Sequence, residues 1–172
     1  IAIGAIRIAQ NLVGVLHVLF LAMENIIPIK AAEILDKKGS ISSLNYLGKM
    51  LIKGGALTLI VLLLIAIFRT QIISLFYGDE FLQHVNLLLG FTVLYVLVFV
   101  ATILGFVIRT FEMNHLFFWS YIITSIFGLM AAKPLITEVG IYGVLVGLFV
   151  SQIINISFYI LKLNSKLKLL WR

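Results

Sequence analysis

The chain alternates between long apolar segments and short polar ones. Five windows of 15 to 28 residues contain no Asp, Glu, Lys or Arg. The shorter windows fall below the length of about 20 residues that a membrane-spanning helix needs, but a basic side chain near a helix end can reach the headgroups and so lengthen the helix. Nothing alternates with period two over about 10 residues, as the strands of a membrane barrel do. The pattern predicts five antiparallel transmembrane helices, at residues 5–28, 51–76, 85–108, 115–135 and 140–162.

The composition agrees with this pattern. Hydrophobic residues make up 62% of the 172 residues and charged residues 12%, whereas soluble domains are about 45–50% apolar and about 25% charged. We therefore predict an all-α integral membrane protein, and exclude a soluble enzyme and a nucleic-acid binder. The absence of cysteine also excludes disulfides, thiolate metal sites and thiol catalysis.

Lys and Arg residues gather at alternate connections. Ten of the 13 lie in or beside the first connection, the third connection and the tail. These ten are Lys30, Lys37, Lys38, Lys49, Lys53, Arg109, Lys162, Lys166, Lys168 and Arg172. Because an excess of Lys and Arg marks the cytoplasmic side, we predict that the tail, residues 163–172, is cytoplasmic. Membrane lipids with anionic headgroups are the expected partners of these cations.

The first connection, residues 29–50, is longer than the others. Pro28 is expected to break the first helix just before it, because proline lacks a backbone donor and clashes with the preceding turn. The stretches 29–35 and 41–52 are amphipathic, and we interpret them as helices that lie along the cytoplasmic interface. The alternative is a solvated linker that docks on nothing.

The first predicted helix carries most of the polar residues that enter the membrane. At 100° per residue its polar and small positions fall within an arc of about 140°. They are Arg7, Gln10, Asn11, Gly14, His17, Glu24, Asn25 and Pro28. Because polar groups inside a membrane usually face the bundle interior or a water-filled cavity, this polar stripe predicts one wall of a cavity or pathway. The alternative is that the uncharged members only bind neighbouring helices, while the two charges, about 25 Å apart, lie in the headgroups.

The last predicted helix carries a weaker stripe. It consists of Ser151, Gln152, Asn155 and Tyr159, and is preceded by Gly143 and Gly147 at small-xxx-small spacing. Such spacing permits close approach of two helices. We interpret this face as a helix-packing surface.

No catalytic constellation stands out in the sequence. There is no Gly-rich phosphate loop with a following Lys and Ser or Thr. His17, His84 and His115 lie on different segments, so no two are spaced to share a metal. We therefore expect no enzyme activity, no metal and no cofactor. Any transport would draw on an ion gradient, the membrane potential or another subunit.

Three segments resemble the C-terminal half of the polysaccharide flippases in the multidrug/oligosaccharidyl-lipid/polysaccharide exporter superfamily. They are Glu-Asn-Ile-Ile-Pro at residues 24–28, Leu-Phe-Tyr-Gly-Asp-Glu-Phe at 75–81 and Val-Gly-Ile-Tyr-Gly at 139–143. Val144 departs from the pattern, because a small residue usually follows that last glycine. The chain begins Ile-Ala-Ile-Gly without a methionine, and we expect it to be a piece of a longer protein.

The resemblance implies a transporter of two lobes, in which this chain forms most of one lobe and further N-terminal helices the rest. Such flippases move a polyprenyl-diphosphate-linked oligosaccharide across the bacterial cytoplasmic membrane by alternating access, for cell-surface polysaccharide synthesis. Arg7 would then attract the diphosphate. Gln10, Asn11, His17 and Asn25 would bind sugar or water. Glu24 would carry a coupling proton or cation.

Two other functions remain open. A cation-coupled multidrug antiporter of the same superfamily is expected to place carboxylates at mid-membrane, and this chain has none deeper than Glu24. A non-transporting scaffold subunit would use the polar stripe to bind a partner helix. A lipid-flipping assay distinguishes these three functions.

Overall fold

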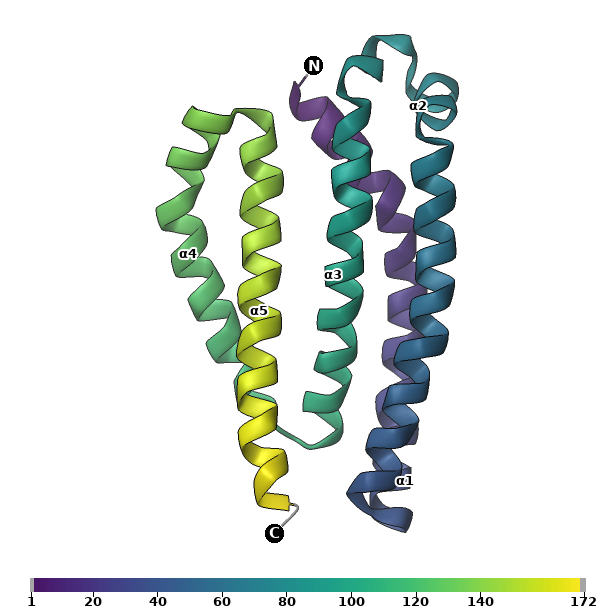
Figure 1. The fold of residues 1–172 in the computed structure, drawn as a ribbon, viewed down its shortest axis with the longest axis vertical. Helices are drawn as coiled ribbons and strands as arrows, with labels where there is room; N and C mark the ends of the chain where they lie inside the picture. The colour runs from purple at the N-terminus through teal and green to yellow at the C-terminus, as the bar shows by residue number, and fades with distance from the viewer. Residues whose placement is uncertain (1, 171–172) are drawn as a thin grey trace.

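The computed structural model describes the backbone of residues 2–170 and the side chains of residues 3–165. Within that range it contains only helices and short turns (Figure 1). The elements are α1 (Ala2–Ile67), α2 (Arg69–Tyr77), the 3-10 helix η1 (Asp79–His84), α3 (Val85–Thr110), α4 (His115–Val139) and α5 (Ile141–Leu170). Four of these stretches are long and apolar enough to cross a membrane: Ile3–Ile67, Asp79–Thr110, His115–Val139 and Ile141–Ser165. The structure therefore fits the predicted all-α membrane protein.

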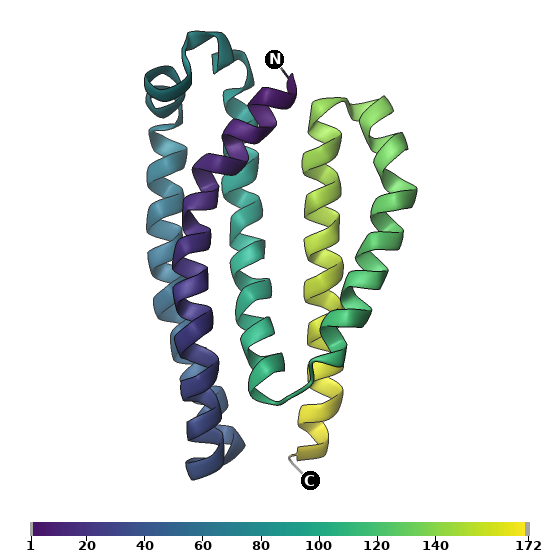
Figure 2. The ribbon, with the colours of Figure 1, turned by 180° about the vertical axis from the view of Figure 1, so that it is seen from behind.

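Helix α1 doubles back on itself at Gly39. This residue has φ 80° and ψ 174°, a backbone conformation that is open almost only to glycine. It divides α1 into a first arm, residues 2–38, and a second arm, residues 40–67, which run antiparallel (Figures 1 and 2). The polypeptide therefore runs along the length of the bundle five times.

The predicted break at Pro28 is wrong. Pro28 lies inside α1, and the helix continues past it to the turn at Gly39. The neighbouring Ile27 and Ala31 are buried in the core, so packing offsets the hydrogen bond that proline removes. Residues 29–50 therefore continue both arms and form the closed end of a helical hairpin.

The closed end of this hairpin is tied together and carries much of the positive charge. The buried Ser43 hydroxyl donates a 2.8 Å hydrogen bond to the Ala31 carbonyl across the two arms. On the surface, Glu33 pairs with Lys30 at 2.7 Å and with Lys37 at 2.8 Å. The 66 residues of α1 fold into a first arm of about 55 Å and a second arm of about 42 Å. Since the hydrocarbon core of a bilayer is about 30 Å thick, the charged end has room to extend beyond it.

Replacing Gly39 with alanine should strain this turn and lower the free energy of unfolding. A side chain at φ 80° is strained, and such a conformation costs about 1–3 kcal/mol. Gly48 is the matched control, because it is exposed and helical, and a Cβ atom added there would meet no atom within 4 Å. Gly48→Ala should leave the unfolding free energy unchanged or raise it by about 0.5–1 kcal/mol. Unfolding in mixed micelles measures both variants, and equal stability of the two would contradict the strained turn.

The second arm ends earlier than the predicted helix 51–76. It stops at Ile67, and α2 then turns away from its axis (Figure 1). At the break the Arg69 guanidinium donates to the Ala66 carbonyl at 2.8 Å, which satisfies an acceptor that a continuous helix would have used. Conversely, α4 and α5 run past their predicted ends, to Val139 and Leu170.

The connections alternate between the two ends of the bundle. The hairpin end at Gly39, the α3–α4 turn and the end of α5 lie together, opposite to α2 and the α4–α5 turn (Figure 1). Those cations predicted to share one side whose side chains are described therefore fall at one end of the bundle. Arg172 lies outside the described residues, as do the side chains of Lys166 and Lys168.

Helix α3 is the centre of the packing. Over half of its most apolar window, 56%, is buried, against 6–11% in the other long helices. It packs against both arms of α1 on one side and against α5 on the other (Figure 1), and α4 packs on α5. The exposed surfaces of the second arm, α4 and α5 carry many large apolar side chains, which is the surface that lipid requires. The first arm and α5 touch each other very little.

Candidate functional site

A cleft lies between the first arm and α5, with α3 as its floor. It consists of two adjoining cavities of about 650 Å³ and about 240 Å³. Val98 of α3 and Gln152 of α5 line both cavities, so the two cavities are neighbours along the same cleft. The cleft exists because α3 packs against both neighbours, while the first arm and α5 stay apart.

The polar stripe of the first arm faces this cleft along most of its length. Gln10, Asn11 and His17 line the larger cavity, and Glu24 lines the smaller one. These four side chains thus lie along a single cleft, although they are up to 14 positions apart in the sequence. The predicted site residues Arg7 and Asn25 are exposed but line neither cavity.

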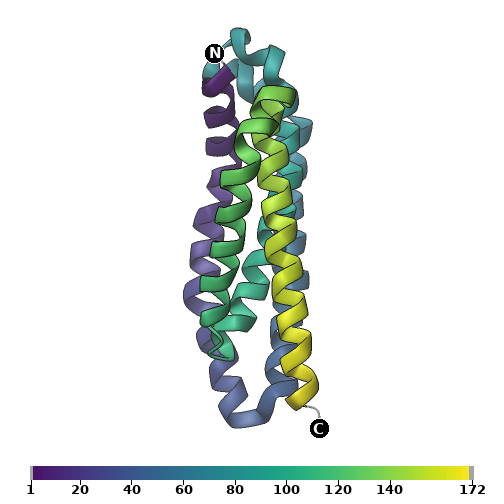
Figure 3. The same cartoon turned by 90° about the vertical axis from the view of Figure 1, so that its left-hand side faces the viewer.

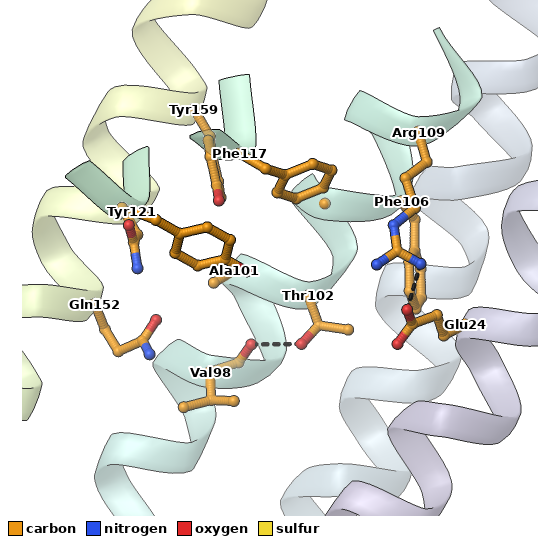
Figure 4. A pocket seen from close by; sticks show the side chains of 12 residues that line it. Glu24, Val98, Ala101, Thr102, Phe106, Arg109, Phe117, Tyr121, Gln152 and Tyr159 are labelled. Carbon is orange, nitrogen blue, oxygen red and sulfur yellow. Dashed lines mark hydrogen bonds and ion pairs between the residues drawn. The ribbon is translucent and has the colours of Figure 1, made fainter. Parts of the chain in front are cut away.

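Helix α5 contributes a second polar wall, on the face that the sequence pattern indicated as a packing surface. Gln152, Asn155 and Tyr159 line the smaller cavity, and Gln152 and Tyr159 lie on the side opposite Glu24 (Figure 4). Asn155 also packs as expected, because its side-chain oxygen accepts a hydrogen bond from the Ser120 hydroxyl of α4. The i, i+3, i+7 spacing of these residues is a signal for a polar wall as well as for packing.

His17 is held at the floor of the cleft by a residue that the sequence did not single out. Its Nε2 atom lies 3.1 Å from the Tyr95 hydroxyl. Tyr95 is only 7% exposed, so its ring is fixed by the core and presents its hydroxyl to the cleft. Because Tyr95 stands within a long apolar run of α3, its polar tip gave no periodic signal in the sequence.

Glu24 has a fixed cationic partner. Its carboxylate accepts a hydrogen bond from the Arg109 guanidinium, and the two form an ion pair between the first arm and the end of α3 (Figure 4). The same guanidinium lies 5.6 Å from the centroid of the Phe117 ring on α4, a distance at which cation–π attraction operates. Arg109 thus links three helices at this end of the cleft. In the sequence, Arg109 stands out only as a loop cation.

The cleft offers neutral hydrogen-bonding groups beside aromatic rings. Amide side chains donate and accept, and hydroxyls do both. Phe117, Tyr121 and Tyr159 supply rings around the smaller cavity, while Thr102 adds a hydroxyl from α3. Among the residues whose side chains are described, no three His, Asp or Glu groups come together to hold a metal ion. The arrangement suits a polar ligand that is rich in hydroxyl groups.

Compared with known proteins, the chain matches no protein-family model, no curated protein and no solved structure. The resemblance to polysaccharide flippases therefore depends on three short segments of sequence. In the structure, residues 24–28 lie within the first arm, and residues 75–81 and 139–143 contain the turns at Gly78 and Gly140, both of which have positive φ.

Proposed function

We propose that this chain forms most of one lobe of a transporter that moves a polyprenyl-diphosphate-linked oligosaccharide across a bacterial cytoplasmic membrane by alternating access. One observation carries the proposal: the polar side chains of the first arm and of α5 turn toward a single cleft, while the outer helix faces are apolar. A hydrophilic cargo that crosses lipid needs such a shielded polar surface. The remaining helices of the transporter would close the open side of the cleft.

Both walls of the cleft, the first arm and α5, would contact the oligosaccharide. Gln10, Asn11 and His17 would hydrogen-bond saccharide hydroxyls from the first arm, and Gln152 and Asn155 from α5. Asn25 lies at the far end of the same stripe and would contact water or sugar at the cleft mouth. Aromatic rings beside these amides provide flat apolar surfaces for sugar rings.

Arg7 is the cation that we assign to the diphosphate. It lies on the polar stripe one turn from Gln10, and no ion-pair partner for it exists among the side chains of residues 3–165. Arg109, in contrast, is already paired with Glu24. The same pairing makes Glu24 a weaker candidate for the coupling site, because a coupling cation would first have to displace the Arg109 guanidinium. It disfavours a cation-coupled drug antiporter for the same reason.

The end of the bundle that holds the Gly39 turn and the end of α5 is assigned to the cytoplasm. Lys30, Lys37, Lys38, Lys49 and Lys53 lie on this hairpin, and Lys and Arg are in excess on the cytoplasmic side of membrane proteins. Arg7 then lies toward the outer leaflet, and the ion pair of Glu24 lies toward the inner leaflet. The oligosaccharide would move through the cleft from the level of Glu24, near the inner leaflet, to the level of Arg7, near the outer leaflet.

A flipping assay on the reconstituted full-length protein tests this function. Vesicles would contain a fluorescent polyprenyl-diphosphate oligosaccharide, and a membrane-impermeant quencher would report how fast the inner pool reaches the outer leaflet. Fluorescent phosphatidylcholine in the same vesicles is the control cargo. We expect faster exchange of the saccharide lipid alone. Exchange no faster than in protein-free vesicles would favour a scaffold, and equal exchange of phosphatidylcholine would contradict a saccharide pathway.

A further inference from the structure

We propose that a groove between α4 and α5, on their face away from the cleft, binds an anionic phospholipid. The groove has a volume of about 370 Å³. It is lined by His115, Leu116, Trp119, Ile123, Phe158 and Lys162. This site is separate from the proposed translocation cleft and does not depend on the cargo that the protein carries.

The periodicity of the two helices builds this groove. His115, Trp119 and Ile123 follow one another at intervals of four residues along one face of α4. Phe117 and Tyr121 line the cleft. Each is two residues from Trp119, which is about 200° around the helix, so they lie on the opposite face of α4. One helix pair (Figure 3) therefore presents the cleft on one side and the groove on the other.

The groove is cationic at one end and apolar along its length. Lys162 is exposed, and its ammonium lies 5.9 Å from the centroid of the Phe158 ring. His115 begins α4 at the same end, whereas Ile123 lies eight residues further along, about 12 Å deeper. The lining contains no carboxylate, so nothing within the groove neutralises the lysine.

This gradient matches the shape and charge of a phospholipid. A lysine at headgroup depth attracts an anionic phosphate, and tryptophan is favoured at the same depth because its ring is amphipathic. Trp119 is 52% exposed, and an acyl chain lying along Trp119 and Ile123 would cover it. An apolar helix packed in the groove would cover its apolar lining but would supply no anion to the Lys162 ammonium. An anionic phospholipid supplies both an acyl chain and a phosphate. We therefore assign the groove to a lipid with a net negative headgroup.

Native mass spectrometry of the purified protein tests the site. The protein would be titrated in detergent with phosphatidylglycerol and with phosphatidylcholine of the same acyl chains. We expect phosphatidylglycerol to bind several-fold more tightly. Lys162→Gln should weaken that binding about fivefold, the factor that corresponds to one surface lysine, and leave phosphatidylcholine unchanged. Ile123→Trp should fill the apolar part and weaken both lipids.

Lys133 provides the matched control. It is an exposed lysine on the same helix α4 but lines none of the cavities described above. Lys133→Gln should therefore retain the preference for phosphatidylglycerol. Equal binding of the two lipids by the wild-type protein, or an equal loss in Lys133→Gln and Lys162→Gln, would overturn the assignment. Because Lys162 is exposed, its variant decides the question even where Ile123→Trp fails to fold.

Discussion

Replacing Arg7 with alanine should strongly slow translocation of the saccharide lipid while leaving the protein folded and inserted. The side chain is exposed and makes no ion pair among the described residues, so its loss should cost little stability. It is nevertheless the one cation of the polar stripe. Hydrogen bonds to a charged group contribute about 1.5–3 kcal/mol, and losing them to a diphosphate should slow translocation by tenfold or more. The flipping assay with the fluorescent saccharide lipid measures the effect.

Two further variants separate a specific role of Arg7 from a general effect of charge. Arg7→Lys keeps the cation but loses the planar fork that binds two phosphate oxygens at once, so it should retain part of the activity. Lys133→Ala removes an exposed cation from α4 and should translocate at the wild-type rate. If Arg7→Ala also exchanged the saccharide lipid at the wild-type rate, the proposed diphosphate contact would be wrong.

Replacing Gly143 with alanine should separate α4 from α5. A Cβ atom at this position would lie 2.1 Å from the Leu135 carbonyl oxygen and 2.5 Å from its carbonyl carbon. Both are backbone atoms of α4, so no side-chain rotation can relieve the clash. Overpacking a core position costs about 1–3 kcal/mol, and a clash with backbone should reach or exceed the upper value. The loss should appear in unfolding by denaturant in mixed micelles.

Gly128→Ala is the control for this effect. Gly128 lies on the same helix pair, but an added Cβ there would meet nothing within 4 Å. Its replacement should leave stability unchanged or raise it slightly, because alanine favours a helix over glycine by about 0.5–1 kcal/mol. A Gly143→Ala protein as stable as Gly128→Ala would show that the two helices do not meet as closely as the structure has them.

The helical architecture could largely be predicted, because each of the five passes along the bundle contains a charge-free apolar window. The departures occurred where tertiary contacts outweighed local preference. Pro28 alone indicates a break, yet burial of its neighbours Ile27 and Ala31 keeps α1 continuous. No glycine or proline marks the break at Phe68, which coincides with the hydrogen bond from Arg69 to Ala66. The spacing of Gly143 and Gly147 did indicate close packing, and Gly143 meets α4.

Part of the candidate site could also be predicted. The polar stripe of the first helix was visible because it interrupts an apolar pattern, and four of its polar members line the cleft. The partners of that stripe could not be found in this way. Tyr95 and Arg109 reach His17 and Glu24 from α3, at sequence separations of 78 and 85. No local period connects residues so far apart, so the fold itself was needed to bring them together.

The central claim is that water reaches the cleft between the first arm and α5, and thiol labelling tests it most directly. Because the chain contains no cysteine, single cysteines can be placed at Asn11 and Gln152 in the cleft, and at Ile60 and Leu129 on exposed apolar faces. A charged maleimide reacts only with thiols in water. We predict labelling of Asn11→Cys and Gln152→Cys in intact membranes and none of Ile60→Cys or Leu129→Cys. Labelling at Ile60 and Leu129, with Asn11 and Gln152 protected, would contradict a water-filled cleft.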